Sequence, residues 1–317
     1  MTMLGAYSRL RRAARHILPN LPLFRGTVVP VVIPEVTAVR LGASAKTAAL
    51  TPTDCTLCGP ATSATSLEPS PVALDARLRL VRCDTCGHVR LSHRPGHIEM
   101  THSFSRDYLE HCALAEYETC GSLARVGGQL VLFPFGNHRF FRPVLDSVRR
   151  FRRNGKIVDC GCGVGFLVDA LQRDGWSAVG IEVSPILVAC GKTSFGLDLR
   201  VASFDALERF TDLDAVTLVE IIEHLFDPVA VLRQIRAWLR PGGGLYITTP
   251  NFDCDDRQRA GMAWDAICAD HYQYFTTATL TRALETAGFH VRWIAETGSR
   301  GLNVPGGHTL RCIAVTQ

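Results

Sequence analysis

Three glycines at alternate positions, preceded by an acid, are the clearest chemical feature of this sequence. Gly161, Gly163 and Gly165 lie within residues 157–168, directly before an apolar helical pattern. Glycine is needed where the backbone adopts a positive φ or must approach a ligand without a Cβ in between. Asp159 ends the short apolar run before the loop. A carboxylate there would repel a phosphate and hold a cationic amino group, so the loop predicts a ligand that carries such a group.

The glycine spacing distinguishes this loop from a dinucleotide-binding turn. A G-x-G-x-x-G turn would place its third glycine at Phe166, whereas the sequence has it at Gly165. The G-x-G-x-G pattern preceded by an acid resembles motif I of class I S-adenosylmethionine (SAM) methyltransferases. Residues 157–251 are similar to that family continuously and in order. The resemblance implies an α/β fold with the Rossmann-like, seven-stranded sheet of those enzymes, and SAM as the cofactor.

Further residues of this stretch are candidates for binding the cofactor. Glu182 ends a second predicted strand, 17 residues after Gly165, where a carboxylate would accept both ribose hydroxyls. After a third predicted strand, Asp205 could accept from an adenine amino group while Phe204 packs on the ring. With Glu220, which ends the fourth predicted strand, the candidate cofactor-binding residues are Asp159, Gly161, Gly163, Gly165, Glu182, Phe204, Asp205 and Glu220.

Two acids and a histidine follow the fourth predicted strand. Glu220, Glu223 and His224 are spaced i, i+3 and i+4, so one helical turn would bring them together. The string VTLVEIIEHL that contains them resembles the ubiquinone-biosynthesis O-methyltransferase family, whose matching residues are associated with a divalent metal such as magnesium. The resemblance makes these three residues candidate metal ligands. Two other roles stay open, namely contact with or deprotonation of the acceptor, and a structural hydrogen bond.

A second histidine, His271, lies in the loop before a helix that Thr276 or Thr277 would cap. This region resembles the H-x-x-x-F segment of the same family, and either an acceptor contact or a structural role fits it. An oxygen acceptor must lose its proton during or before attack on the sulfonium methyl, and histidine is the natural base near neutral pH. We therefore expect His224 to be the base, with Glu223 beside it and His271 as the second choice.

Two C-x-x-C-G turns, separated by 24 residues, lie before the methyltransferase-like stretch of residues 157–251. They contribute Cys55 and Cys58, then Cys83 and Cys86. Four thiolates complete a tetrahedral zinc site, and such a site is structural because no coordination position remains for water. The position resembles the N-terminal zinc-binding domain of methyltransferases in sugar and secondary-metabolite pathways. The alternative is chance pairing of cysteines that merely pack.

The length of 317 residues accommodates one α/β domain and a smaller module. We expect a basic, flexible N-terminal segment at 1–50, a zinc-knuckle module at 51–96, a helical linker and acceptor lid at 97–139, and the methyltransferase domain at 140–317. The arginines of residues 149–153 end a predicted helix, where they form either a solvated face or a patch for a phosphate-bearing substrate.

Charge and hydropathy limit the classes of partner. Residues 1–50 hold seven basic residues and one acid, Glu35, so their net charge is +6. The whole chain has a net charge of +4, so the remaining residues carry −2. A body with this charge is not a general polyanion binder, so nucleic acid is not expected as a partner. No apolar run approaches the ~18 residues of a membrane span. Twelve cysteines without an evident secretory signal indicate reduced thiols and a cytoplasmic location.

The expected function is SAM-dependent methylation of a small-molecule acceptor, at a hydroxyl of a secondary metabolite or a sugar-linked intermediate. Two alternatives remain. One is an RNA methyltransferase that grips phosphates with its zinc knuckles and arginine-rich segments. The other is a non-catalytic protein that binds SAM and zinc and acts through interactions.

Overall fold

The computed structural model describes most of the chain from residue 123 onwards and shorter stretches before it. The described residues are 29–30, 51–60, 62–67, 78–94, 123–126, 129–132, 134–203, 209–268, 270–298 and 306–317. Phe204 and Asp205, the candidate adenine contacts, lie outside them. Within the described part, no helix has the length and apolar character needed to cross a membrane.

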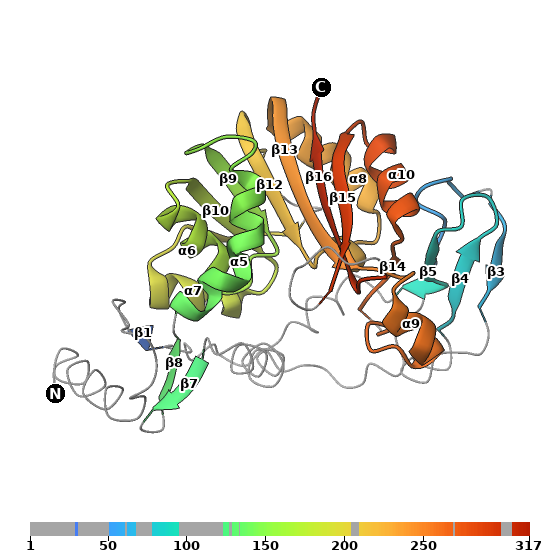
Figure 1. The fold of residues 1–317 in the computed structure, drawn as a ribbon, viewed down its shortest axis with the longest axis horizontal. Helices are drawn as coiled ribbons and strands as arrows, with labels where there is room; N and C mark the ends of the chain where they lie inside the picture. Colours follow the sequence, from blue (N-terminus) through green and yellow to red (C-terminus); the bar gives the residue numbers. More distant parts are fainter. Residues whose placement is uncertain are drawn as a thin grey trace.

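A seven-stranded sheet forms the centre of the fold, in the order β11-β10-β9-β12-β13-β16-β15 (Figure 1). The strands from β11 to β13 are parallel, whereas β16 is antiparallel to both of its neighbours. This order confirms the predicted Rossmann-like methyltransferase sheet. The strands are β9 (Lys156–Cys160), β10 (Ser177–Glu182), β11 (Leu199–Val201), β12 (Leu213–Val219), β13 (Leu239–Pro250), β15 (His290–Thr297) and β16 (Thr309–Val315).

Successive strand residues point to opposite sides of the sheet, and apolar side chains occur on both sides. Helices therefore cover both faces. Ile157 and Tyr246 face a core shared with α5, α6 and α7, while Val158 and Leu245 face a core shared with α8 and α10 (Figure 1). The helices are α5 (Pro134–Val148), α6 (Phe166–Arg173), α7 (Pro185–Phe195), α8 (Pro228–Trp238), α9 (Asp255–Ala260) and α10 (Thr277–Thr286), with single 3₁₀ turns η4 (Ile222–His224) and η5 (Gly261–Ala263).

The second C-x-x-C turn connects β4 to β5 in a small sheet that includes a strand from the C-terminal part of the chain, and the first turn lies between β2 and β3. The order of this small sheet is β14-β5-β4-β3, and β14 pairs antiparallel with β5. The strands are β3 (Ala64–Ser66), β4 (Leu80–Cys83), β5 (Val89–Leu91) and β14 (Gln273–Tyr274), and β2 (Thr51–Pro52) pairs with β6 (His93–Arg94) beside them. The predicted knuckle segment therefore shares a sheet with the large domain.

The predicted helical linker at 97–139 is helical in one described part and extended in another, because residues 134–139 belong to α5 whereas the stretch before them forms strands. Residues 123–132 contain a hairpin of β7 (Leu123–Val126) and β8 (Gln129–Leu132), with β1 (Val29–Pro30) paired to β8. The two residues between β7 and β8 are both glycine, a composition that favours a two-residue hairpin turn over a helix.

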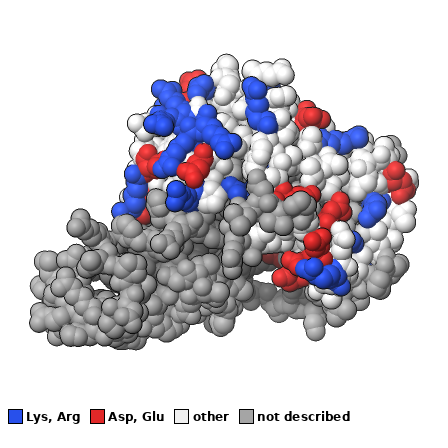
Figure 2. All heavy atoms as spheres, viewed as in Figure 1, with Lys and Arg blue, Asp and Glu red and all other residues white. Residues whose placement is uncertain are grey.

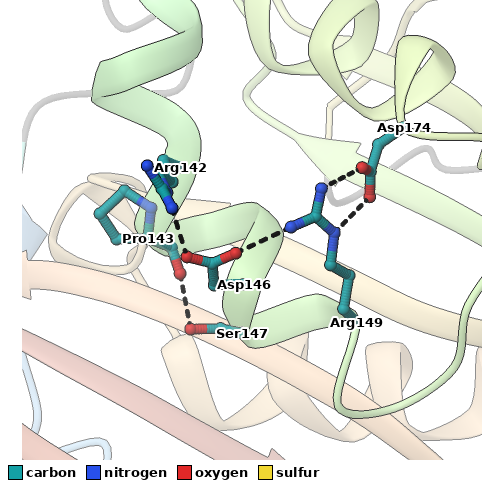
Figure 3. A network of polar contacts seen from close by, with 6 residues as sticks. All are labelled: Arg142, Pro143, Asp146, Ser147, Arg149 and Asp174. Carbon is teal, nitrogen blue, oxygen red and sulfur yellow. Dashed lines mark hydrogen bonds and ion pairs between the residues drawn. The ribbon is translucent and has the colours of Figure 1, made fainter.

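Ion pairs occupy much of the arginine-rich stretch at the end of α5. Arg149 pairs with Asp146 at 2.8 Å and with Asp174 (Figure 3). In addition, Arg152 pairs with Asp214 at 3.0 Å. Figure 2 shows basic side chains gathered, with acids among them, at the end of the sheet where the parallel strands begin. The glycine loop follows the opposite end of β9. Because the arginines lie at the end of the sheet opposite the glycine loop, their position favours a solvated face over a patch that binds a phosphate-bearing substrate.

Candidate cofactor and acceptor site

The glycine loop connects β9 to α6 with positive φ at each of its glycines. The φ values of Gly161, Gly163 and Gly165 are 74°, 56° and 89°. A Cβ at Gly161 would collide with the side chain of Ile221, and one at Gly165 would lie 2.7 Å from Leu197 Cδ1. The sequence interpretation gave two reasons for these glycines, a positive φ and close approach to a ligand. Two of the glycines are also required by packing against the protein itself.

Glu182 holds the glycine loop from the end of β10. One of its carboxylate oxygens accepts the N–H of Gly163 at 3.0 Å, and the other accepts the N–H of Ser184 at 2.9 Å. The side chain is buried, and burial raises its pKa. Each carboxylate oxygen retains a second lone pair, so Glu182 fits the predicted acceptance of ribose hydroxyls while it orders the loop.

Asp159 lies buried at the end of β9. The hydroxyl of Thr217 donates to one of its carboxylate oxygens at 2.7 Å. Burial raises the pKa of Asp159 to about 7, with the charge of Glu182 acting in the same direction and the Thr217 hydroxyl opposing it. A cation beside this carboxyl would favour its ionised form. Asp159 and Glu182 together fit a ligand that carries both an amino group and a ribose.

The segment after β12 forms a tighter turn than the sequence predicts. Glu220 has a φ of +54°, and the single 3₁₀ turn η4 starts only at Ile222. A non-glycine residue in this region is strained, and such residues concentrate at functional sites. Glu220 therefore precedes the helical turn instead of sharing it, which corrects the expected i, i+3, i+4 arrangement with Glu223 and His224. Its negative charge nevertheless acts on Glu223, whose pKa it helps to raise.

The structure brings Glu223, His224 and His271 together, with one potential ligand atom of each lying within 4.8 Å of the others. The two imidazole rings meet edge to face with centroids 4.6 Å apart. Nδ1 of His224 lies 2.8 Å from the Asp270 carbonyl, and Nδ1 of His271 lies 2.8 Å from the Ala266 carbonyl. A carbonyl only accepts, so each Nδ1 carries the proton and each neutral ring keeps its lone pair on Nε2.

Burial sets the protonation of this cluster. It lowers the pKa of His224, and together with the neighbouring His224 it lowers the pKa of His271 to about 4. Both rings are therefore neutral near pH 7. Burial and the charge of Glu220 raise the pKa of Glu223 well above its usual range. One carboxylate oxygen of Glu223 accepts from Thr249 at 2.9 Å, and the other is buried without a hydrogen-bond partner.

A pocket of about 660 Å³ opens beside Glu220 at the same edge of the sheet. Four acids line it together with an aromatic ring, an arginine and a histidine, and these residues are Glu220, Asp255, Asp256, Asp265, Trp264, Arg259 and His308. Except for Glu220, the sequence interpretation missed them. They lie in α9, directly after η5 and in the chain before β16, where no local motif marks them.

The four knuckle cysteines converge, as predicted. Their sulfur atoms all lie within 4.8 Å of one another, and Cys55 Sγ and Cys86 Sγ are 3.6 Å apart. Zn–S bonds of about 2.3 Å in a tetrahedron place sulfurs about 3.8 Å apart. Gly59 and Gly87 have φ values of 89° and 74°, which only glycine adopts readily. The four thiols therefore fit a zinc ion.

The sheet order, the glycine loop after β9 and the acids that end β9 and β10 define a class I SAM-dependent methyltransferase. Residues 135–292 match the methyltransferase domain family, and the chain belongs to this class of enzyme. In addition, it carries the four-cysteine cluster.

Curated relatives match a shorter part of the chain. The chain is 37% identical over 103 residues to the ubiquinone biosynthesis O-methyltransferase of Xanthomonas campestris pv. campestris (strain B100), covering 30% of this chain and 43% of the relative. The corresponding protein of Xanthomonas oryzae pv. oryzae (strain PXO99A) is 35% identical over 112 residues, or 33% of this chain and 47% of that one. The chain thus spans less than half the length of these relatives.

Solved structures of similar fold include a SAM-dependent methyltransferase from Clostridium acetobutylicum ATCC 824. It has a TM-score of 0.49 and 9% identity, and the match covers 66% of this chain and 98% of that chain. A SAM-dependent methyltransferase from Mesorhizobium loti has a TM-score of 0.46 and 18% identity, covering 55% of this chain and 97% of that chain.

Proposed function

We propose that this enzyme transfers the methyl group of SAM to a hydroxyl group of a small molecule, a secondary metabolite or a sugar-linked intermediate. The observation that carries the proposal is the group formed by the buried Glu223 and the half-buried His224 and His271, two neutral imidazoles and a carboxyl within 4.8 Å. Such a group can take a proton from a hydroxyl near neutral pH. Relatives named ubiquinone biosynthesis O-methyltransferases support an oxygen acceptor.

In this proposal the residues at the ends of β9 and β10 bind the cofactor and those after β12 handle the acceptor. Bound SAM supplies an electrophilic methyl on a sulfonium. Glu182 and the glycine loop would orient it, and Asp159 would hold its amino group. On the acceptor side, His224 Nε2 would take the proton of the hydroxyl that accepts this methyl group. Alignment of the reacting atoms by these residues would lower the activation free energy by several kcal/mol.

A divalent metal such as magnesium is the second candidate for activating the hydroxyl. The unpartnered carboxylate oxygen of Glu223 favours it, because a buried carboxylate oxygen is rarely left without a partner. With His224 and His271 it would supply three ligand atoms. In this case Glu220 is not a ligand but a charge that acts on Glu223.

Calorimetry with SAM, followed by transfer of a radiolabelled methyl group, tests the proposed function. The acceptors to be offered are 3,4-dihydroxybenzoate, UDP-glucose and bulk tRNA, with the product's methyl position read by NMR. We expect transfer to oxygen of a small acceptor. Transfer to tRNA with a steep salt dependence would favour the RNA alternative. Tight SAM binding without transfer to any acceptor would favour the non-catalytic interaction protein.

The pH dependence of SAM affinity tests the role assigned to Asp159. Its pKa of about 7 means that it is half ionised at that pH and mostly ionised about one pH unit above it. The ionised form would hold the amino group, so affinity should be highest near pH 8 and decline as pH falls through 7. Calorimetry between about pH 6 and pH 8 should show up to about a tenfold change.

Two variants separate this effect from a general loss of binding. Asp159→Asn keeps an oxygen that can accept from Thr217 but removes the titrating charge, so weaker and nearly pH-independent binding is expected. Asp174→Asn removes an acid that pairs with Arg149 at the other end of the sheet, and its pH profile should match wild type. An unchanged profile in Asp159→Asn would refute the assignment.

The zinc ion and the location complete the proposal. We assign one zinc to Cys55, Cys58, Cys83 and Cys86, in a structural role. The ten described cysteines are free thiols, which supports a reducing compartment such as the cytoplasm.

A further inference from the structure

Hydrogen bonds join the four-cysteine module to the segment that carries the proposed base. Strand β5 pairs with β14, and the N–H of Leu91 donates to the carbonyl of Tyr272 at 3.0 Å. The N–H of Tyr272 in turn donates to the carbonyl of Glu223 at 2.8 Å. His271 lies two residues before β14. Two hydrogen bonds that share Tyr272 therefore link the backbone of the module to Glu223, and Tyr272 is the residue after His271.

The side chain of Gln273 makes a second link in parallel with the first. Its amide nitrogen donates to the carbonyls of Leu225 and Phe226 at 3.1 and 3.2 Å, directly after η4. Its amide oxygen lies 2.8 Å from His88 Nε2 in a buried contact. Because the two carbonyls can only accept, the amide orientation is fixed, and His88 Nε2 must be the donor. All three bonds of this amide are thereby assigned.

His88 connects the link to the second knuckle. It follows Cys86 by two residues and is fully buried, with its ring 5.1 Å from that of Phe275. Its backbone carbonyl accepts the N–H of Cys83 at 2.9 Å. Any shift of the knuckle would therefore move His88 and, through Gln273, the chain that follows His224.

We infer that His88 and Gln273 are positioning residues, through which the four-cysteine module holds the η4 turn and His271 in place for the acceptor. The geometry of the link is independent of what the enzyme methylates. Its catalytic consequence rests on the function proposed above. The knuckle module is then a brace for the acceptor side of the site, beyond its part in folding.

Substitutions at both ends of the link test this inference. His88→Leu removes the donor at similar volume, and His88→Gln restores an N–H that can reach Gln273. Gln273→Leu breaks the link from the other side and serves if His88→Leu fails to fold. Thr65→Val is the matched control, because it removes a side-chain hydrogen bond to Asp84 within the module but touches neither β5 nor β14.

Amide hydrogen exchange of the full chain, with metal content measured in parallel, gives a readout that needs no acceptor. In His88→Leu, exchange in residues 220–226 and 270–275 should accelerate about tenfold, while residues 157–168 stay near wild type. His88→Gln should recover most of the protection, and Thr65→Val should not change it. Unchanged exchange in 220–226, or equal acceleration across the sheet, would overturn the inference.

Turnover then separates the inference from the proposed function. With an acceptor in hand, His88→Leu should lower kcat about tenfold at unchanged SAM affinity, and His88→Gln should restore it. Wild-type kcat in a His88→Leu protein with altered exchange would refute the catalytic consequence. If no hydroxyl acceptor is methylated at all, the proposed function fails, while the exchange result still decides whether the link holds η4.

Discussion

Replacing His224 with alanine should reduce kcat by ~10²–10⁴-fold while SAM affinity stays near wild type. The proposed base would be lost, but Asp159, Glu182 and the glycine loop would remain. Nδ1 of His224 is committed to the Asp270 carbonyl at 2.8 Å, which leaves Nε2 to take the proton. Initial rates at saturating SAM, together with calorimetry of SAM binding, measure the two effects separately.

The pH dependence of activity is a second, independent test of His224 as the base. Burial lowers the pKa of His224, so the neutral base should persist to below pH 6.5, and activity should fall only as pH drops through that lowered value. This acidic limb should disappear in His224→Ala. His290→Ala, which removes an exposed histidine on β15, should leave both rate and profile unchanged.

Near-full turnover of His224→Ala would remove this residue from both the base and the metal proposals, and His271 would become the next position to test. If a metal activates the hydroxyl, Glu223→Gln should be as damaging as His224→Ala, and chelation should abolish activity. Chelators also strip zinc from the cysteines. Restoration by added magnesium alone is therefore required before the metal route is accepted.

Features set by a short stretch of chain could be predicted from the sequence. The glycine loop, Glu182 at the end of β10 and the paired cysteines each depend on local spacing, since a strand end or a tight turn fixes where such residues point. The seven-stranded sheet follows from the same ordered motifs. These expectations required no knowledge of contacts between distant segments.

The composition of the acceptor side could not be predicted in this way. His224 and His271 are 47 positions apart in the sequence, and their ring contact depends on how β14 docks on β5. The sequence indicated each histidine separately but not their pairing. Likewise, the regular spacing of Glu220 and Glu223 suggested a helical turn, whereas the chain leaves β12 through a residue with a φ of +54°. Such a turn is set by tertiary packing, which overrides local periodicity.

Loss of the four-cysteine site should destabilise the whole domain. Purified protein should contain about one zinc per chain, and Cys83→Ser should remove it and lower the thermal midpoint by roughly 10 °C or more. Cys83 and Leu57 belong to the same core as Leu280 and Leu284 of α10, and Arg282 donates to Cys58 Sγ at 3.5 Å. Differential scanning calorimetry with elemental analysis measures both quantities.

The number of thermal unfolding transitions in Cys83→Ser shows whether the cysteine module is coupled to the large domain or folds independently. Because β14 and the core of α10 join the cysteine module to the large sheet, Cys83→Ser should unfold in a single transition at lower temperature. Cys268→Ser, which changes a half-buried cysteine outside the cluster, should leave zinc content and midpoint near wild type. An early, separate transition with the main one unchanged would show that the module folds independently. It would also weaken the argument that the module can hold the acceptor-side histidines, because a module that melts without disturbing the sheet transmits little constraint to it.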